Sequence, residues 1–399
     1  MADTRASSWA RDARDLYLVA MAVFVVNIVI GILNGADAVE FDRNQILTHV
    51  HAGTVGWLSL GIVASTFLLF RSSDRRLALA LALLVPVYVL AFYTGSFAFR
   101  AIGGTLLLLV IAWLIVWLWQ AYLAAERSLP RLAVLLGLTT FGYGAVVGVL
   151  LQLQFALELE LVPGDGIGAH ASAMTFGYLV MAAMGFIEWR LLGTRGLPVL
   201  GVVQVAALFA GGLVISIGLL FGFEQAAGGI YLLTQLVAVV LFIARVWPTS
   251  LRVRWLGTDA ARHLGAASLW VVGALVLFMY LVFSFITAEN PDDPAAFPLN
   301  VLIASDHATY IGVITNIVVA LMLAVLLARA TIADWARHLV FWGINLGLAV
   351  FVIGLIVDTP ELKRIGAPVM GVTLLATLGI LAWTAARAHP SSDAEPGPA

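Results

Sequence analysis

Long apolar runs, separated by short polar segments, follow one another along almost the whole chain. Each run is about 20 residues or longer, which is the length that an α-helix needs to cross the hydrocarbon core of a bilayer. The separating segments carry arginine, proline, glycine and acidic residues. The pattern predicts twelve membrane-spanning helices, over residues 15–34, 47–70, 76–96, 101–124, 130–153, 168–192, 197–222, 226–246, 265–287, 301–328, 334–357 and 366–386.

Composition agrees with an all-α polytopic membrane protein and excludes several kinds of site. Hydrophobic residues make up 62% of the 399 residues and charged residues 11%, so soluble folds are set aside. The chain has no cysteine, which excludes disulfides, thiolate metal sites, iron–sulfur clusters and covalently attached c-type haem. The lipid bilayer is the expected surrounding, and no binding to nucleic acid is expected.

The distribution of basic residues predicts the orientation of the chain. An even number of spans places both termini on one side of the membrane. Seventeen of the 21 lysine and arginine residues fall on that side, and only Arg43, Arg100, Lys363 and Arg364 fall on the other. The positive-inside rule therefore predicts cytoplasmic termini in a bacterial-type plasma membrane.

Three segments follow from these predictions. Residues 1–14 form a cytoplasmic N-terminus, and residues 15–387 form the twelve-helix transmembrane domain. Residues 388–399 are rich in proline, serine and acidic residues, with too little apolar surface to pack, and are predicted to be a disordered cytoplasmic tail.

Four of the seven histidines lie at one depth, at the start of three even-numbered spans. His49 and His51 begin the second span, His170 the sixth and His307 the tenth. At about 1.5 Å per residue, all four lie a few ångströms below the outer surface. The other three are interpreted as solvated residues on the cytoplasmic side: His263, His338 and His389.

The spacing of these histidines indicates an internal repeat. Spans two, six and ten are each the second of a block of four. Each carries a His-Ala pair followed by glycines that allow close approach of a helix or a flat macrocycle. We therefore predict three pseudo-symmetric four-helix units, whose equivalent spans face a common axis or shared pockets. The pairs are His51-Ala52, His170-Ala171 and His307-Ala308.

The His-x-His pair carries a geometric constraint. His49 and His51 are about 200° apart on an ideal helix, so their rings point to opposite sides and cannot both bind one ion. Either His49 precedes the helix, or the pair serves two sites on opposite flanks of it. Neutral imidazoles from different helices are common ligands of haem iron and of transition metals. The alternative is interfacial histidines bonded to outer-loop carbonyls or to Glu158, Asp165 and Asp306.

With these spans and histidines, the chain resembles the haem–copper oxidase subunit I superfamily, and within it the NnrS-like proteins, which are haem- and copper-containing membrane proteins linked to nitric oxide stress. His49-Val50-His51 matches a His-x-His on their second helix, and His307-Ala308 with Gly312 is similar to a motif on a later helix. The resemblance implies that His51 and His307 are axial ligands of a b-type haem, with His49 a further candidate. It implies that His170 takes the position that binds copper, or another transition metal, in oxidases.

The sequence also departs from the oxidases. Span seven lacks the histidine pair that completes their copper site, span ten has one histidine where they have two, and Met174 stands where many have tyrosine. No acidic or basic residue lies near the middle of a predicted span, so we expect no proton pumping. The expected function is a membrane-bound b-type haem protein. It would bind nitric oxide or a similar diatomic gas, or transfer electrons from a quinol or cytochrome near the outer face. Whether it acts as an oxidoreductase is left open.

Two other functions fit the same residues. A metal-ion transporter would use the histidines and the acidic outer loops to gather a cation. A cofactor-free subunit would keep an oxidase-like fold without its chemistry. A haem protein is coloured when purified, whereas neither alternative is.

Overall fold

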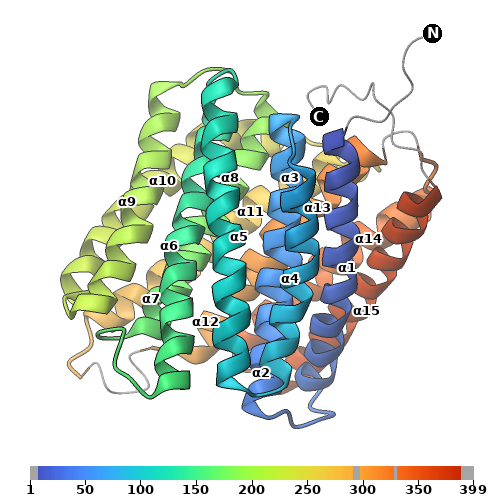
Figure 1. Ribbon diagram of the computed structural model, residues 1–399. Helices are drawn as coiled ribbons and strands as arrows, with labels where there is room; N and C mark the ends of the chain where they lie inside the picture. The colour runs from blue at the N-terminus through green and yellow to red at the C-terminus, as the bar shows by residue number, and fades with distance from the viewer. Residues whose placement is uncertain (1–7, 291–296, 328–329, 388–399) are drawn as a thin grey trace. The chain divides into compact units, whose positions relative to one another are not determined.

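The computed structural model describes residues 8–290, 297–327 and 330–387, which form helices joined by turns, with one isolated bridge between Ser128 and Gly196. Within these residues, twelve helical spans are long and apolar enough to cross a membrane (Figure 1). The predicted number and order of spans are therefore confirmed, and the chain is a multi-pass membrane protein. The spans are α1 (Ser8–Gly35); α2, η1 and α3 (Arg43–His51, Ala52–Ser59, Leu60–Phe70); α4 (Arg75–Tyr93); α5 (Phe97–Ala124); α6 (Leu129–Leu157); α7, η2, α8 and η3 (Gly166–Ser172, Ala173–Leu179, Val180–Ile187, Glu188–Leu192); α9 (Val199–Phe221); α10 (Glu224–Ser250); α11 (Ala261–Ile286); α12, η5, α13 and η6 (Leu299–His307, Ala308–Thr315, Asn316–Leu321, Met322–Leu326); α14 (Asp334–Ile356); and α15 (Pro360–Arg387).

The first helix differs most from its predicted boundary. It begins at Ser8, whereas the apolar run begins at residue 15. Hydropathy marks the part of a helix that crosses hydrocarbon, and a helix continues beyond it wherever its polar residues find partners. Residues 1–7 of the predicted N-terminus, and the predicted disordered tail 388–399, lie outside the described residues.

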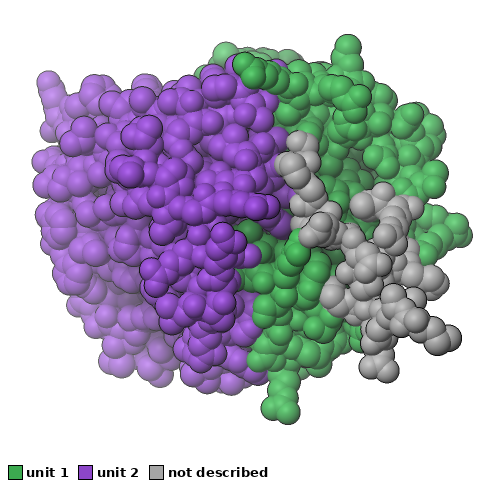
Figure 2. All heavy atoms as spheres, turned by 90° about the horizontal axis from the view of Figure 1, so that it is seen from above, with its two compact units in different colours: residues 1–95, 252–267, 310–399 green, residues 96–251, 268–309 purple. Residues whose placement is uncertain are grey.

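The chain divides into two compact units, shown in green and purple in Figure 2, and the predicted three four-helix units do not appear as three compact bodies. Unit 1 comprises residues 1–95, 252–267 and 310–399, and unit 2 comprises residues 96–251 and 268–309. Two of the boundaries between the units fall inside a helical span. The boundary after residue 267 lies in α11, and the boundary after residue 309 lies in the tenth span.

Each unit has its own tightly packed helices. In unit 1, α14 and α15 pack along each other, and α1 packs against α3, α4 and α15. Trp57 stacks on Phe24 of α1, with ring centroids 4.7 Å apart, and its indole N–H donates to Thr315 Oγ1 at 2.8 Å. In unit 2, α9 packs along α10, and α6 packs against α5, η2 and α8.

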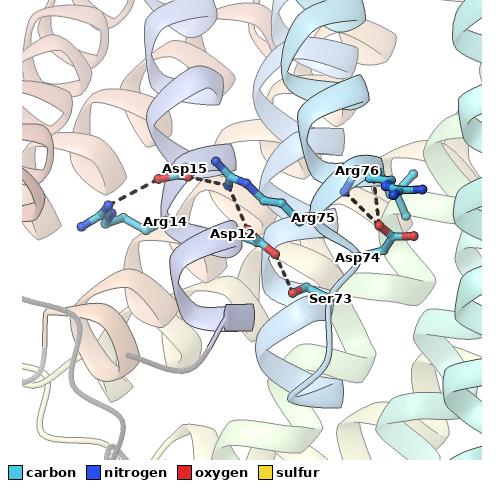
Figure 3. Close-up of polar contacts among 8 residues, drawn as sticks. Asp12, Arg14, Asp15, Ser73, Asp74, Arg75 and Arg76 are labelled. Atoms are coloured by element: carbon cyan, nitrogen blue, oxygen red, sulfur yellow. Dashed lines mark hydrogen bonds and ion pairs between the residues drawn. The ribbon is translucent and has the colours of Figure 1, made fainter. Parts of the chain in front are cut away.

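A polar cluster joins α1 to the start of α4 in unit 1 (Figure 3). Asp12 is buried, and its carboxylate accepts from Ser73 Oγ at 2.6 Å and from Arg75 at 2.9 Å. Arg75 also donates to Asp15 at 2.7 Å. Because Asp12 has partners here, the helix extends past the apolar run and anchors the loop between α3 and α4.

We expect Asp12→Ala to lower the free energy of unfolding in detergent micelles by about 1–2 kcal/mol, because two charge-assisted hydrogen bonds are lost. Asp15→Ala is the matched control. Asp15 is about one-third exposed and pairs with the same half-exposed Arg75, so its loss should cost less than about 1 kcal/mol. Equal losses in the two variants would contradict the anchoring role of Asp12.

Candidate functional site

The second span begins well before its histidines. Asp42 caps α2: its side chain accepts from the Gln45 N–H at 2.8 Å, and the Gln45 side chain accepts from the Asp42 N–H at 2.9 Å. This reciprocal capping box starts the helix at Arg43. The hypothesis that His49 precedes the helix is therefore wrong, and His49 and His51 point to opposite flanks.

His49 faces α1. Its Nδ1 donates to the backbone carbonyl of Asn27 at 2.9 Å, and the Asn27 amide returns a hydrogen bond to the His49 carbonyl at 2.5 Å. Gly31, one turn further along α1, makes room for the ring, because a Cβ there would lie 3.0 Å from His49 Cε1. His49 therefore ties the second span to the first.

His51 faces α4. Its Nδ1 donates to the Leu47 carbonyl one turn earlier, at 2.8 Å. Its ring stacks on Phe92, with centroids 3.6 Å apart and planes 15° apart, and Tyr88 meets it edge-on at 6.1 Å. A neutral imidazole that donates from Nδ1 carries its lone pair on Nε2, which is the tautomer that ligates a metal through Nε2. Both the tautomer and the ring plane of His51 are therefore fixed.

His170 repeats the arrangement of His49, not that of His51. Its Nδ1 donates across to the Gly144 carbonyl of α6 at 2.8 Å. Gly148, one turn further along α6, makes room for the ring, because a Cβ there would lie 2.7 Å from His170 Cε1. His170 therefore ties the sixth span to the fifth.

His307 repeats the arrangement of His51. It ends α12, and its Nδ1 donates to the Ile303 carbonyl one turn earlier, at 2.8 Å. The imidazole thus carries its lone pair on Nε2, as in His51. His51 and His307, the two residues implied as axial ligands, thus both bond to a carbonyl of their own helix. The other two candidates, His49 and His170, both bond to a carbonyl of the preceding span.

Wide π-helical turns allow the three spans to be aligned with one another without reference to their histidines. They begin at Ala52, Ala173 and Ala308, and among the described residues such turns occur only in spans two, six and ten. Superposing the three alanines also superposes three glycines, each four residues later: Gly56, Gly177 and Gly312. Turns of this kind are rare and are frequent at functional sites.

This alignment corrects the predicted equivalence of the three His-Ala pairs. In span six, the residue equivalent to Ala52 and Ala308 is Ala173, two positions after the predicted Ala171. Three residues before each alanine is a position that we name the bridging position, occupied by His49, His170 and Ser305. One residue before each alanine is the inner position, occupied by His51, Ser172 and His307. His170-Ala171 is therefore not equivalent to His51-Ala52.

The bridging position has one role in all three spans. Like the two histidines, Ser305 donates to a backbone carbonyl of the preceding span, from Oγ to Ala274 of α11 at 3.0 Å. One turn after that carbonyl, the glycine of the other two sites is replaced by Phe278, which stacks on Phe176 at 3.5 Å. A small serine and a large phenylalanine thus fill the space that an imidazole and a glycine fill elsewhere.

Spans two and ten share one more feature. At the end of the π-helical turns, Ser59 Oγ donates to the Thr54 carbonyl at 2.8 Å, and Thr315 Oγ1 donates to the Tyr310 carbonyl at 2.9 Å. Each donor lies five residues after its acceptor, where the wide turn leaves the carbonyl accessible. Span six has Val180 at this position, so spans two and ten form the most similar pair.

The three histidine-bearing spans are also the most buried. In their apolar parts, 89%, 83% and 78% of the residues are buried in spans two, six and ten, against at most 72% in the other nine. Polar residues in such spans are costly and tend to be functional. The four candidate histidines, each half-buried, lie at the heads of these three spans.

Within the described residues, no three histidine, aspartate or glutamate side chains come together as a metal site. A haem iron held by two imidazoles does not need such a cluster. A three-histidine copper centre does need such a cluster. Copper or another transition metal at His170 therefore stays a prediction. The ring of His170 is hydrogen-bonded to the α6 backbone.

The interpretation of His263 as a solvated residue is wrong. It is 1% exposed, and its Nδ1 donates to Asn316 Oδ1 at 2.8 Å. Asn316 and Asn345 exchange amide hydrogen bonds at 3.0 and 3.2 Å. Since these partners come from spans ten and eleven, local sequence could not identify them. His338 is half-buried beside Arg262, and His389 lies outside the described residues.

We expect Gly148→Val to destabilise the protein by roughly 2–4 kcal/mol, because the added side chain displaces His170 and leaves its half-buried imidazole without its acceptor. Gly273→Val is the control, since a Cβ at Gly273 meets nothing within 4 Å and the change should cost less than about 1 kcal/mol. The measurement is unfolding in detergent micelles. Similar losses in both variants would show that space around His170 is not limiting.

The sequence alone did not identify the acceptors Asn27 and Gly144 or the π-helical turns, because spacing within one helix carries no information about the helix that it faces. The His-x-His motif and the glycines did point to spans two, six and ten, which carry the π-helical turns. Comparison with known protein families and with curated proteins finds no match for the chain.

Proposed function

We propose that this protein is a membrane haem protein in which His51 and His307 each supply a neutral imidazole to haem iron. The observation that carries the proposal is their shared geometry. Both occupy the inner position before a π-helical turn, and both donate from Nδ1 to the carbonyl one turn earlier. That hydrogen bond leaves the lone pair on Nε2 and raises the basicity of the ligand, as in other metal-bound histidines.

The residues around this position also suit a haem. The neutral donor set is typical of low-spin b-type haem, and Phe92 holds the His51 ring in one plane. Haem would supply the binding of a diatomic gas such as nitric oxide, or one-electron transfer from a quinol or cytochrome. The chain's own residues orient each imidazole through the carbonyl one turn earlier, and Phe92 and Tyr88 lie against the His51 ring.

The shared register supports a further part of the proposal, that the chain consists of three related four-helix segments, as in the haem–copper oxidase subunit I superfamily. His49 and His170 then serve as bonds between neighbouring spans. Their Nδ1 hydrogen bonds leave the lone pair on Nε2, as in His51, and His170 is the residue that would hold copper or another transition metal. Cytoplasmic termini and the absence of proton pumping complete the proposal.

The test is a reduced-minus-oxidised optical spectrum of the purified protein, with its iron and copper contents. Sharp low-spin b-type bands with iron bound are expected, and addition of nitric oxide should shift them if the gas binds. A colourless, iron-free protein would refute haem binding and would favour the cation transporter or the cofactor-free subunit.

A further inference from the structure

The buried face of α10 carries two polar residues deep within unit 2. Tyr231 and Gln235 are four residues apart and therefore lie on one side of the helix. Both are 0% exposed. On neighbouring turns, large apolar residues of α10 are exposed instead, among them Leu233, Leu236 and Val240. At about 1.5 Å per residue, the two polar groups lie roughly 10 and 16 Å from the start of α10 at Glu224.

Neither residue finds a hydrogen-bond partner in the described chain. Tyr231 Oη, Gln235 Oε1 and Gln235 Nε2 are all buried and unpaired. Buried side-chain polar atoms have partners in the large majority of cases, and three unpaired atoms on adjacent turns of one helix are therefore unusual. Nearby Thr234, by contrast, satisfies its hydroxyl with carbonyls of its own helix.

The surroundings of these atoms include aromatic rings and the backbone of a glycine. Phe176 and Phe278 meet the Tyr231 ring edge-on, with centroids 6.2 and 5.5 Å away. Gly211 of α9 faces the Gln235 amide, and a Cβ on Gly211 would lie 2.9 Å from Nε2. At Gly211, α9 therefore presents its backbone to the amide nitrogen at close range.

We propose that Tyr231 and Gln235 form a buried water-binding site in unit 2. A buried water needs two to four polar partners, and this pair offers a phenol that donates and accepts, a carbonyl oxygen that accepts and an amide that donates twice. Because the site has no charged group among these residues, its ligand is neutral. Bound water would supply exchangeable protons within this apolar interior. The site does not depend on the proposed haem.

The proposal is tested by X-ray hydroxyl-radical footprinting of the full-length purified protein, read by mass spectrometry. Radicals form from bound water, so buried Tyr231 should be oxidised several-fold faster than Tyr17. Tyr17 is the matched control, because it is equally buried but its hydroxyl is bonded to Ser65 at 2.7 Å. Equal, slow oxidation of the two tyrosines would overturn the proposal.

A second measurement uses Gln235→Leu. If water binds, loss of the amide should reduce Tyr231 oxidation towards the Tyr17 rate and lower Tm. If the site is dry, the substitution removes an unpaired amide, and Tm should rise. A rise in Tm, or unchanged Tyr231 oxidation in the folded variant, would contradict the proposal, and the wild-type comparison stands even if the variant does not fold.

Discussion

Alanine at His307 or at His51 is expected to abolish the low-spin haem bands of the purified protein. Both residues hold the inner position, with Nδ1 bonded to the carbonyl one turn earlier. A haem iron held by these two residues would become high-spin, or would dissociate with its haem, if one of the two imidazoles were removed. The measurement is the reduced-minus-oxidised spectrum together with the iron content per protein.

The matched controls are His49→Ala and His170→Ala. Each control removes an imidazole from a span that is also largely buried, but from the bridging position, where Nδ1 is bonded to Asn27 or Gly144 of the preceding span. The haem bands should persist in both, with some loss of thermal stability. Added imidazole should restore the low-spin bands of His51→Ala if the variant retains its fold, because the free ligand replaces the missing side chain.

Two outcomes would contradict this assignment. Retention of the low-spin bands in both inner-position variants would place the ligands elsewhere. Loss of the bands in His49→Ala or His170→Ala, with rescue by imidazole, would make a bridging histidine a ligand of the haem.

The second large effect is expected at a buried ion pair in unit 2. Glu188 of η3 is 2% exposed, and Arg245 of α10 donates to both of its carboxylate oxygens at 2.8 Å. Gln204 of α9 accepts from the same arginine at 2.9 Å and donates to Glu188 at 3.3 Å. Removing one member of such a pair leaves a buried charge without compensation. Arg245→Met should therefore destabilise the protein by about 3–5 kcal/mol.

The double variant Glu188→Gln with Arg245→Met separates charge from packing. With both charges gone, most of the lost stability should return, because replacing a buried pair by neutral groups is often nearly neutral. Arg254→Met is the control, since Arg254 pairs with Asp259 at an exposed position, and should cost less than about 1 kcal/mol. If the double variant were as unstable as Arg245→Met, the loss would come from packing of the arginine stem.

These ion-paired and buried arginines also show where loop assignment from sequence fails. Arg245 is one of the seventeen basic residues that the sequence assigns to the cytoplasmic side, yet it lies in α10 and pairs within the protein. Arg262 is another of the seventeen, yet it is 1% exposed and lies over the Phe341 ring at 4.6 Å. Hydropathy treats every charge as solvated, whereas a partner on another helix allows it to be buried.

The sequence by itself determined the number, order and approximate limits of the twelve spans, because the length of each apolar run must match the thickness of a bilayer whatever the helices pack against. It also placed the four histidines at the heads of spans two, six and ten, and rotation along one helix showed that His49 and His51 point apart.

Only the tertiary structure decided which of these histidines are alike. His49 and His170 form one pair and His51 and His307 another, because the acceptors of the first pair, Asn27 and Gly144, belong to neighbouring helices, whereas the second pair bonds within its own helix. The π-helical turns that set this register also depend on packing. An inserted residue in a wide turn weakens the helix locally and is stabilised by the side chains packed around it. The pairing of the histidines and the position of the π-helical turns could therefore not be deduced from spacing along a single chain.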